Sequence, residues 1–284
     1  MITASPSTRL SSPAPDWRSL WRDAITDAAE LLDLLGLGDR TDLLPADDAG
    51  FALRVPRGFV ARMRQHDPRD PLLLQVLPQR AEHDQTAGYT TDAVGDLAAR
   101  AGQGLLHKYD GRALLIASGS CAVNCRYCFR RHFPYNEELA AAAQWSEALA
   151  QLRADPSIRE LILSGGDPLA LATHKLEELT LGLAELPHVI RLRVHTRLPV
   201  VLPERIDDAF VAWLAALPLP QVVVLPATPA PELDASVDAA CTRLRDAGAK
   251  LLNQSVLLRG VNDNADALTD LSERLFAAGV LPYY

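Results

Sequence analysis

The chain has 284 residues, of which 48% are hydrophobic and 23% charged, and its net charge is −8. This length suits one large α/β domain, alone or with a smaller appendage. The acidic balance and the lack of like-charge blocks argue against a nucleic-acid partner. No apolar run is long enough to span a membrane. Three of the four cysteines fall within eight residues, which is unlike a disulfide framework and favours the cytoplasm.

The N-terminal part of the sequence differs from the rest. Residues 1–15 are rich in Ser, Thr and Pro and are expected to form a flexible tail. Residues 16–110 show helical periodicity over Trp17–Leu35 and few strand-like runs. They are also broken repeatedly by proline, at Pro45, Pro56, Pro68, Pro71 and Pro78. We therefore predict a mainly helical N-terminal extension over 16–110.

From residue 111 to 284 apolar strand patterns alternate with helical ones, as in repeated βα units. The predicted strands are Ala113–Ser118, Leu161–Ser164, Ile190–His195, Val222–Leu225, Leu251–Leu257 and Val280–Tyr284. The predicted helices are Ala141–Arg153, His174–Leu186, Glu204–Ala216, Ala235–Ala247 and Ala265–Ala278. Six strands are fewer than the eight of a closed barrel. The predicted fold is therefore α/β, an open partial (β/α)6 barrel whose active face lies at the carboxyl ends of the strands.

A run of three cysteines follows the first predicted strand: Cys121, Cys125 and Cys128. Iron–sulfur clusters are held by cysteine thiolates, and a cubane normally takes four of them. Three thiolates would leave one iron open to a ligand that is not protein. The alternatives are three buried thiols or a partial zinc knuckle, for which His132 or the distant Cys241 would have to supply a fourth ligand.

The second predicted strand ends in Gly165, Gly166 and Asp167, followed by Pro168. Glycines allow close backbone approach and unusual dihedrals. A simple βα turn explains the same residues, with Asp167 as a helix N-cap and Pro168 at the first helical position. The pattern alone does not separate a binding role from this turn.

The cysteine run, with Tyr127 before its last cysteine, resembles the signature of the radical S-adenosylmethionine superfamily. The resemblance implies a radical SAM partial barrel with a [4Fe-4S] cluster on Cys121, Cys125 and Cys128. It also implies that S-adenosylmethionine binds the open iron and is cleaved by one electron to a 5′-deoxyadenosyl radical. Gly165, Gly166 and Asp167 match that superfamily's motif for the methionine amino group.

Further segments resemble the lysine 2,3-aminomutase family within that superfamily. They are His107-Lys-Tyr109-Asp-Gly-Arg112, Cys128-Phe-Arg130-Arg131, His195-Thr-Arg197 and Asn253-Gln-Ser-Val-Leu-Leu-Arg-Gly-Val-Asn-Asp263. Segments Arg54–Met63 and Asp70–Pro78 are similar to the EpmB branch, which makes (R)-β-lysine for elongation factor P. The likeness runs from Trp17 to the last residue.

The family resemblance implies roles for individual residues. Tyr127 and His195 would lie at the S-adenosylmethionine site, although a histidine at a strand end is as often a structural hydrogen-bonding group. Arg130 would bind the substrate carboxylate, for which a planar fork of donors is suited, and Asp263 the distal ammonium of L-lysine. Without the family these two read as an exposed loop arginine and a turn or helix-cap residue.

Pyridoxal phosphate contacts are implied for three further residues, Lys108, Tyr109 and Arg112. The resemblance also implies an external reductant, such as flavodoxin or ferredoxin, and an indirect link to elongation factor P.

The sequence departs from the family pattern in two places. An aminomutase of this family holds pyridoxal phosphate through a lysine, and the three lysines here, Lys108, Lys175 and Lys250, do not match that position. The matching segment would lie beyond Tyr284, so a C-terminal truncation is expected. Leu225–Pro231 replaces a polar motif that lines the cofactor site in relatives. Two alternatives stay open: a protein that cleaves S-adenosylmethionine without aminomutation, and a non-catalytic iron–sulfur protein.

Overall fold

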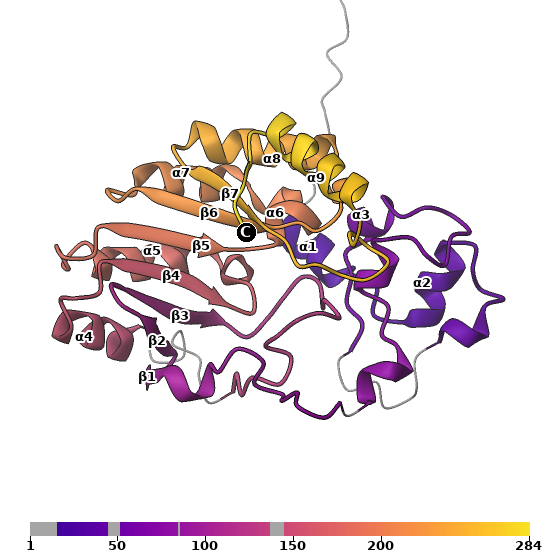
Figure 1. Ribbon diagram of the computed structural model, residues 1–284. Helices are drawn as coiled ribbons and strands as arrows, with labels where there is room; N and C mark the ends of the chain where they lie inside the picture. Colours follow the sequence, from indigo (N-terminus) through magenta and orange to yellow (C-terminus); the bar gives the residue numbers. More distant parts are fainter. Residues whose placement is uncertain (1–15, 45–51, 85, 137–144) are drawn as a thin grey trace, which may run out of the picture.

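The computed structural model describes residues 16–44, 52–84, 86–136 and 145–284. The predicted tail at 1–15 and the first residues of the predicted helix at 141–144 lie outside the described residues. The described chain forms one open eight-stranded sheet in the order β1-β2-β3-β4-β5-β6-β7-β8 (Figure 1). The strands are β1 Arg100–Gly102, β2 Leu105–Tyr109, β3 Arg112–Ser118, β4 Glu160–Gly165, β5 Arg191–His195, β6 Gln221–Pro226, β7 Lys250–Gln254 and β8 Leu281–Pro282.

The last six strands pair in parallel, each with its neighbour in sequence, so the prediction of an open partial (β/α)6 barrel is confirmed. The α-helices are α1 Trp17–Arg22, α2 Ala28–Leu34, α3 Arg57–Val60, α4 Ser146–Ala154, α5 Thr173–Leu183, α6 Leu198–Val201, α7 Asp208–Ala216, α8 Ala235–Asp246 and α9 Ala265–Ala277. Short 3-10 turns complete the described structure: η1 Thr41–Leu43, η2 Leu73–Gln75, η3 Arg80–His83, η4 Leu97–Ala99, η6 Pro168–Ala170, η7 Pro203–Arg205 and η8 Ala230–Glu232.

The predicted strands differ from the observed ones mainly at their ends. The strand predicted to run to Leu257 stops at Gln254, and the last strand is two residues long. The five predicted helices correspond to α4, α5, α7, α8 and α9. The short helix α6, directly after β5, is not predicted by the sequence pattern; it starts at Leu198 with a proline in its first turn.

The strands β1 and β2 also differ from the prediction, which is mainly helical up to residue 110. Strand β2 is antiparallel to β3, and Tyr109 faces Arg112 across the connection. The two residues between them are Asp110 and Gly111, and Gly111 has a φ of 76°. Asp-Gly is a strong two-residue hairpin signal. This Asp110-Gly111 turn is visible in the sequence, and it joins β2 to β3, the first strand of the parallel barrel.

The N-terminal extension is built from short helices rather than one long one. The predicted helical stretch Trp17–Leu35 is split into α1 and α2, capped by the side chains of Asp16 and Asp27. Between them, Ile25 makes a β-bridge with Val55. In Figure 1 the extension, with α2 and α3, lies beyond the carboxyl ends of the parallel strands. It therefore covers the end of the barrel where an active site is expected.

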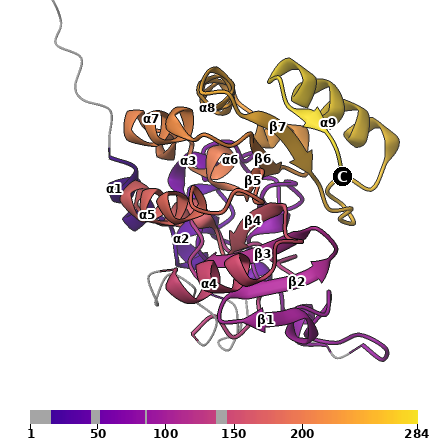
Figure 2. The same ribbon diagram turned by 90° about the vertical axis from the view of Figure 1, so that its left-hand side faces the viewer.

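One hydrophobic core joins the extension to the barrel. Buried residues of the extension such as Phe59 and Leu72 belong to the same cluster as Leu115 and Leu163 in the sheet. Helices α4, α5, α7 and α8 follow one another along the outer side of the sheet, as Figure 2 shows. None of the described helices combines the length and apolarity needed to cross a bilayer. The helices thus pack along the outer side of the parallel strands, while the extension packs at their carboxyl ends.

Candidate active site

The predicted cluster loop, Cys121–Cys128, leaves the carboxyl end of β3. A hydrogen bond from the Ser120 amide to Ser118 Oγ (3.0 Å) turns the chain out of the strand. Another, from the Cys128 amide to the Cys125 carbonyl (3.0 Å), closes a turn between the last two cysteines. All three thiols are half-buried. Burial raises the pKa of Cys121 and of Cys128, so both favour the thiol form until a metal replaces the proton.

The three cysteines do not form a site for a single ion. Within the described ranges, no three His, Cys, Asp or Glu side chains gather closely enough to hold one metal ion. A cubane makes a different demand, because each cysteine ligates a separate iron. Three thiols on one short loop have the donor chemistry that such a cluster needs, and one of them, Cys125 Sγ, accepts a hydrogen bond from the buried Arg197 guanidinium.

The N-terminal extension holds the cluster loop by its backbone. The Asn124 amide donates to the Arg54 carbonyl (3.0 Å), and its side-chain Nδ2 donates to the Ala52 carbonyl (2.7 Å). The Arg126 amide donates to the Gln75 carbonyl (2.8 Å). The loop is therefore not free to take its own conformation, because its middle is paired with the extension.

A half-buried carboxylate, that of Glu82, strengthens this attachment. Glu82 accepts from Arg131 Nη1 at 2.9 Å and also pairs with Arg126, whose Nη1 donates to the Leu74 carbonyl (2.6 Å). Burial opposes ionisation of Glu82, but the two guanidinium groups outweigh it and the pKa of this carboxyl is lowered. Sequence reasoning did not single out Glu82, which lies far from the cysteines in sequence.

Gly165 and Gly166 at the end of β4 are packed against the backbone that leads into the cluster loop. A Cβ on Gly165 would lie 2.5 Å from the Ser118 carbonyl oxygen, and one on Gly166 would lie 2.7 Å from that of Ser120. The Gly166 amide donates to the Ser118 carbonyl (2.6 Å). Only glycine allows this approach. The predicted binding motif thus also fixes the loop that carries the cysteines.

Asp167 has the local role that the turn interpretation describes. Its carboxylate caps η6 through the Leu169 amide (3.0 Å) and accepts from Thr196 Oγ1 (2.6 Å) and the Arg197 amide (2.8 Å). Burial raises its pKa above the usual range. Asp167 therefore ties the end of β4 to the segment after β5, and its predicted role toward S-adenosylmethionine stays a prediction.

Tyr127 and His195 carry buried polar atoms with no hydrogen-bond partner among the described residues, Tyr127 Oη and His195 Nε2. Burial lowers the pKa of His195 to about 4, so the ring is neutral at pH 7. The ring of Tyr127 lies against the guanidinium of Arg197, 5.5 Å from its centroid. Unsatisfied buried groups of this kind fit a site that receives a polar ligand.

Arg130, the predicted ligand of the substrate carboxylate, is buried rather than exposed. Its Nε donates to Asp96 Oδ2 (2.7 Å) and its Nη1 to Ser164 Oγ (2.9 Å). Lys108 donates to the other oxygen of Asp96 (2.7 Å). The structure thus brings together Arg130 and Lys108, which were predicted to contact different ligands. Asp96 was not found from the sequence, because nothing near it marks it as special.

Three predicted residues lie away from this cluster of contacts. Tyr109 and Arg112 face each other at the amino end of β3, the end opposite the cysteine loop, and the Arg112 guanidinium stacks 4.9 Å from the Tyr109 ring centroid. Asp263 is exposed in the loop after β7, where it accepts from the Gly260 amide (3.0 Å) as a turn residue does. Their predicted contacts with pyridoxal phosphate and with the substrate ammonium stay predictions.

Lys175 and the Leu225–Pro231 segment have structural partners, and Lys250 lies far from the cysteine loop. Lys175 pairs with Glu178 (2.9 Å) on the outside of α5, and Lys250 is exposed at the amino end of β7. The segment after β6 is held by Asn253 Nδ2, which donates to the Leu225 and Ala227 carbonyls (3.0 and 2.9 Å).

Comparison with known proteins places this site in a family. The radical SAM superfamily pattern matches residues 115–271, which include the end of β3, the cluster loop and the whole of β4 to β7. The chain is 47% identical over 278 residues to the L-lysine 2,3-aminomutase of Escherichia coli, covering 97% of this chain and 81% of that protein. It is 44% identical to that of Haemophilus influenzae (95% and 80%) and 32% identical to that of Clostridium subterminale (95% and 65%).

The open barrel and the three-cysteine loop are thus those of a radical SAM enzyme, which implies a [4Fe-4S] cluster and S-adenosylmethionine. Within this class, the chain belongs to the L-lysine 2,3-aminomutase family of isomerases.

Proposed function

We propose that the chain is a radical SAM L-lysine 2,3-aminomutase that converts L-α-lysine to (R)-β-lysine. Its cluster would be held by Cys121, Cys125 and Cys128. The observation that carries the proposal is the cluster loop, which is fixed from the barrel by Gly165 and Gly166 and from the extension through Asn124 and Arg126. A loop held on both sides presents three thiolates in a fixed arrangement and leaves one iron for a small ligand.

In such an enzyme the cluster and S-adenosylmethionine supply a 5′-deoxyadenosyl radical, and pyridoxal phosphate stabilises the migrating amino group. The chain's own residues orient these groups and keep water out. Tyr127 Oη and His195 Nε2 are buried and lack protein partners in the described part of the chain, so they can bond to a bound cofactor. The neutral imidazole of His195 can donate or accept there without adding charge.

Arg130 would bind the substrate carboxylate through its two donor edges. In the structure these edges are occupied by the carboxylate of Asp96 and the hydroxyl of Ser164. A substrate carboxylate would therefore have to displace the Asp96 carboxylate from the Arg130 guanidinium. When L-lysine binds, the Asp96 carboxylate would keep its second hydrogen-bond donor, the ammonium group of Lys108.

A second candidate is a radical SAM enzyme that cleaves S-adenosylmethionine without moving an amino group. The placement of the lysines favours it. Lys108 is bound to Asp96, Lys175 pairs on the surface of α5, and Lys250 lies at the amino end of β7. The two candidates differ in whether this chain attaches pyridoxal phosphate, which borohydride reduction followed by peptide mass spectrometry tests directly.

The proposal extends to a supply of β-lysine for elongation factor P, with L-lysine as the small-molecule substrate and a flavodoxin or ferredoxin as reductant. It is supported by the segments Arg54–Met63 and Asp70–Pro78, which resemble the EpmB branch. In a strain lacking its own L-lysine 2,3-aminomutase, this chain should restore the lysyl mass increase on elongation factor P. If elongation factor P stays unmodified in this strain, the proposed activity would be limited to free L-lysine, without a role in modifying the factor.

The activity test uses anaerobically reconstituted protein with reductant, S-adenosylmethionine and L-lysine. The proposal predicts 5′-deoxyadenosine and β-lysine, both lost in Cys125→Ser, whereas Cys241→Ser, which changes a buried cysteine of α8, should keep them. Formation of 5′-deoxyadenosine without β-lysine would select the second candidate. Formation of neither product would reject both.

A further inference from the structure

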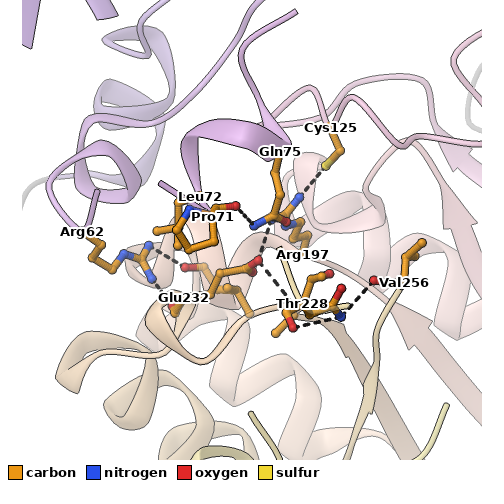
Figure 3. A network of polar contacts seen from close by, with 12 residues as sticks. Arg62, Pro71, Leu72, Gln75, Cys125, Arg197, Thr228, Glu232 and Val256 are labelled. Carbon is orange, nitrogen blue, oxygen red and sulfur yellow. Dashed lines mark hydrogen bonds and ion pairs between the residues drawn. The ribbon is translucent and has the colours of Figure 1, made fainter. Parts of the chain in front are cut away.

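Arg197 lies buried beneath the cluster loop and is bonded to one of its sulfurs. Its Nη1 donates to Cys125 Sγ (2.6 Å), while its Nη2 donates to Gln75 Oε1 (2.9 Å) and Glu232 Oε1 (3.1 Å), as Figure 3 shows. Arg197 is 6% exposed and Glu232 is fully buried. Arginine keeps its charge under all ordinary conditions. A permanent positive charge therefore sits at Cys125, and the Glu232 carboxylate pairs with it as a counter-charge.

This arrangement is held rigidly. The Arg197 guanidinium lies between the rings of Phe59 and Tyr127, 5.5 Å from each centroid. Glu232 is fixed in turn, because its Oε1 also accepts from the Thr228 amide (3.3 Å). Because neither group can swing away to solvent, their charges act on the sulfur at fixed distances.

The position of these charges matters for electron transfer. Reduction of an iron–sulfur cluster adds one negative charge, and hydrogen bonds to its sulfurs and local charge set its potential. Charges interact strongly in a buried setting because water does not screen them. A cation at Cys125 therefore stabilises the reduced cluster more than the oxidised one, and a nearby carboxylate has the opposite effect.

We propose that Arg197 is a positioning residue that raises the reduction potential of the cluster through Cys125, and that Glu232 limits this effect. The inference rests on the proposed cluster at Cys121, Cys125 and Cys128. The electron comes from an external low-potential one-electron donor and enters the cluster. No covalent bond in the protein forms or breaks, and Arg197 keeps its proton.

A purely structural role would be different. Arg197 also links Gln75 of the N-terminal extension to Glu232 after β6, and it could serve only to join these parts. Joining the parts would depend on the hydrogen bonds and not on the sign of the charges. The two roles therefore separate when the charges are removed one at a time.

The test is a redox titration of the reconstituted cluster, followed by electron paramagnetic resonance. Arg197→Gln should disfavour reduction at least tenfold, which is a shift of about 59 mV to lower potential for one electron. Glu232→Gln should shift the potential upward. Arg197→Lys keeps the charge and should stay closer to wild type than Arg197→Gln.

Arg62→Gln is the matched control, because Arg62 is a half-buried arginine that bonds to the Glu232 carbonyl but not to a sulfur, and it has its own counter-charge in Asp234 (3.8 Å). The Arg62→Gln substitution should change the equilibrium constant for reduction of the cluster by less than about threefold.

Unchanged potentials in both charge-neutralising variants, or shifts in the same direction, would overturn the proposal. If Arg197→Gln does not retain its cluster, the upward shift in Glu232→Gln decides alone, and its absence overturns the inference. A wild-type chain that assembles no cluster by iron and sulfide analysis would reject the proposed function and this inference together. An assembled cluster with insensitive potentials would reject only the inference.

Discussion

At the residue scale, the neutral imidazole of His195, whose Nε2 is buried, gives the protein a pH-dependent stability. Its pKa is lowered from 6.5 to about 4 by burial. Between these values the unfolded chain binds a proton that the folded chain does not, so stability falls as the pH falls from about 6.5 to about 4. The loss is at most about 3 kcal/mol. Thermal or urea unfolding of wild type and His195→Gln across this range measures it.

The comparison isolates His195, because the acidic groups with lowered pKa values are common to both proteins and cancel. The difference in the free energy of unfolding between the two should change steadily through this pH window. A difference that does not vary with pH would show that the imidazole is not held in its neutral form.

Arg130 permits a second prediction at this scale. Its two donors bind separate oxygens, on Asp96 and Ser164, and a lysine ammonium cannot reproduce that planar fork. Arg130→Lys should raise the KM for L-lysine about tenfold or more, equivalent to about 1.4 kcal/mol of binding. Arg153→Lys, on the exposed surface of α4, should leave KM unchanged. Equal KM values in the two variants would exclude Arg130 from substrate binding.

At the element scale, the end of β4 determines where the cluster loop runs. In Gly166→Ala the new methyl would lie 2.7 Å from the Ser120 carbonyl oxygen and 2.9 Å from the Gly119 carbonyl carbon. The loop must shift, so we expect a loss of about 1–3 kcal/mol in stability and a lower iron content after reconstitution.

Gly58→Ala in α3 provides a matched control, since nothing lies within 4 Å of the position that its new methyl would take. It should be neutral or slightly stabilising. If Gly166→Ala had the same stability and iron content as Gly58→Ala, the close packing of the end of β4 on the cluster loop would not contribute to stability or to cluster assembly.

The parallel strands β3 to β7 could be predicted because each is a short apolar run followed by a helical pattern. Strands β1 and β2 could not be found in this way, because β1 is short and largely exposed and β2 is half polar. The turn Asp110-Gly111 was the available signal. The site was predictable where it is local in sequence, as in Cys121–Cys128. Arg197, Glu232 and Asp96 were not predictable as partners, because their contacts join residues far apart in the chain.

At the scale of the whole molecule, the N-terminal extension is part of the site and not only an appendage. Glu82 attaches it to the cluster loop through Arg126 and Arg131. Glu82→Gln should therefore lower the free energy of unfolding by about 1–3 kcal/mol and speed iron loss to a chelator. Glu185→Gln, in an exposed pair with Arg153, should cost at most about 0.5 kcal/mol. Equal rates of iron loss in Glu82→Gln and Glu185→Gln would show that the pairs made by Glu82 do not hold the cluster loop in place.

The central claim is that the three cysteines hold a cluster with one iron free for S-adenosylmethionine. Electron paramagnetic resonance of the reduced, anaerobically reconstituted protein, recorded with and without S-adenosylmethionine, tests it most directly. The account predicts a cluster of about four irons and four sulfides whose spectrum changes when S-adenosylmethionine is added. A spectrum that stays the same, or a metal content of zinc instead of iron, would contradict it.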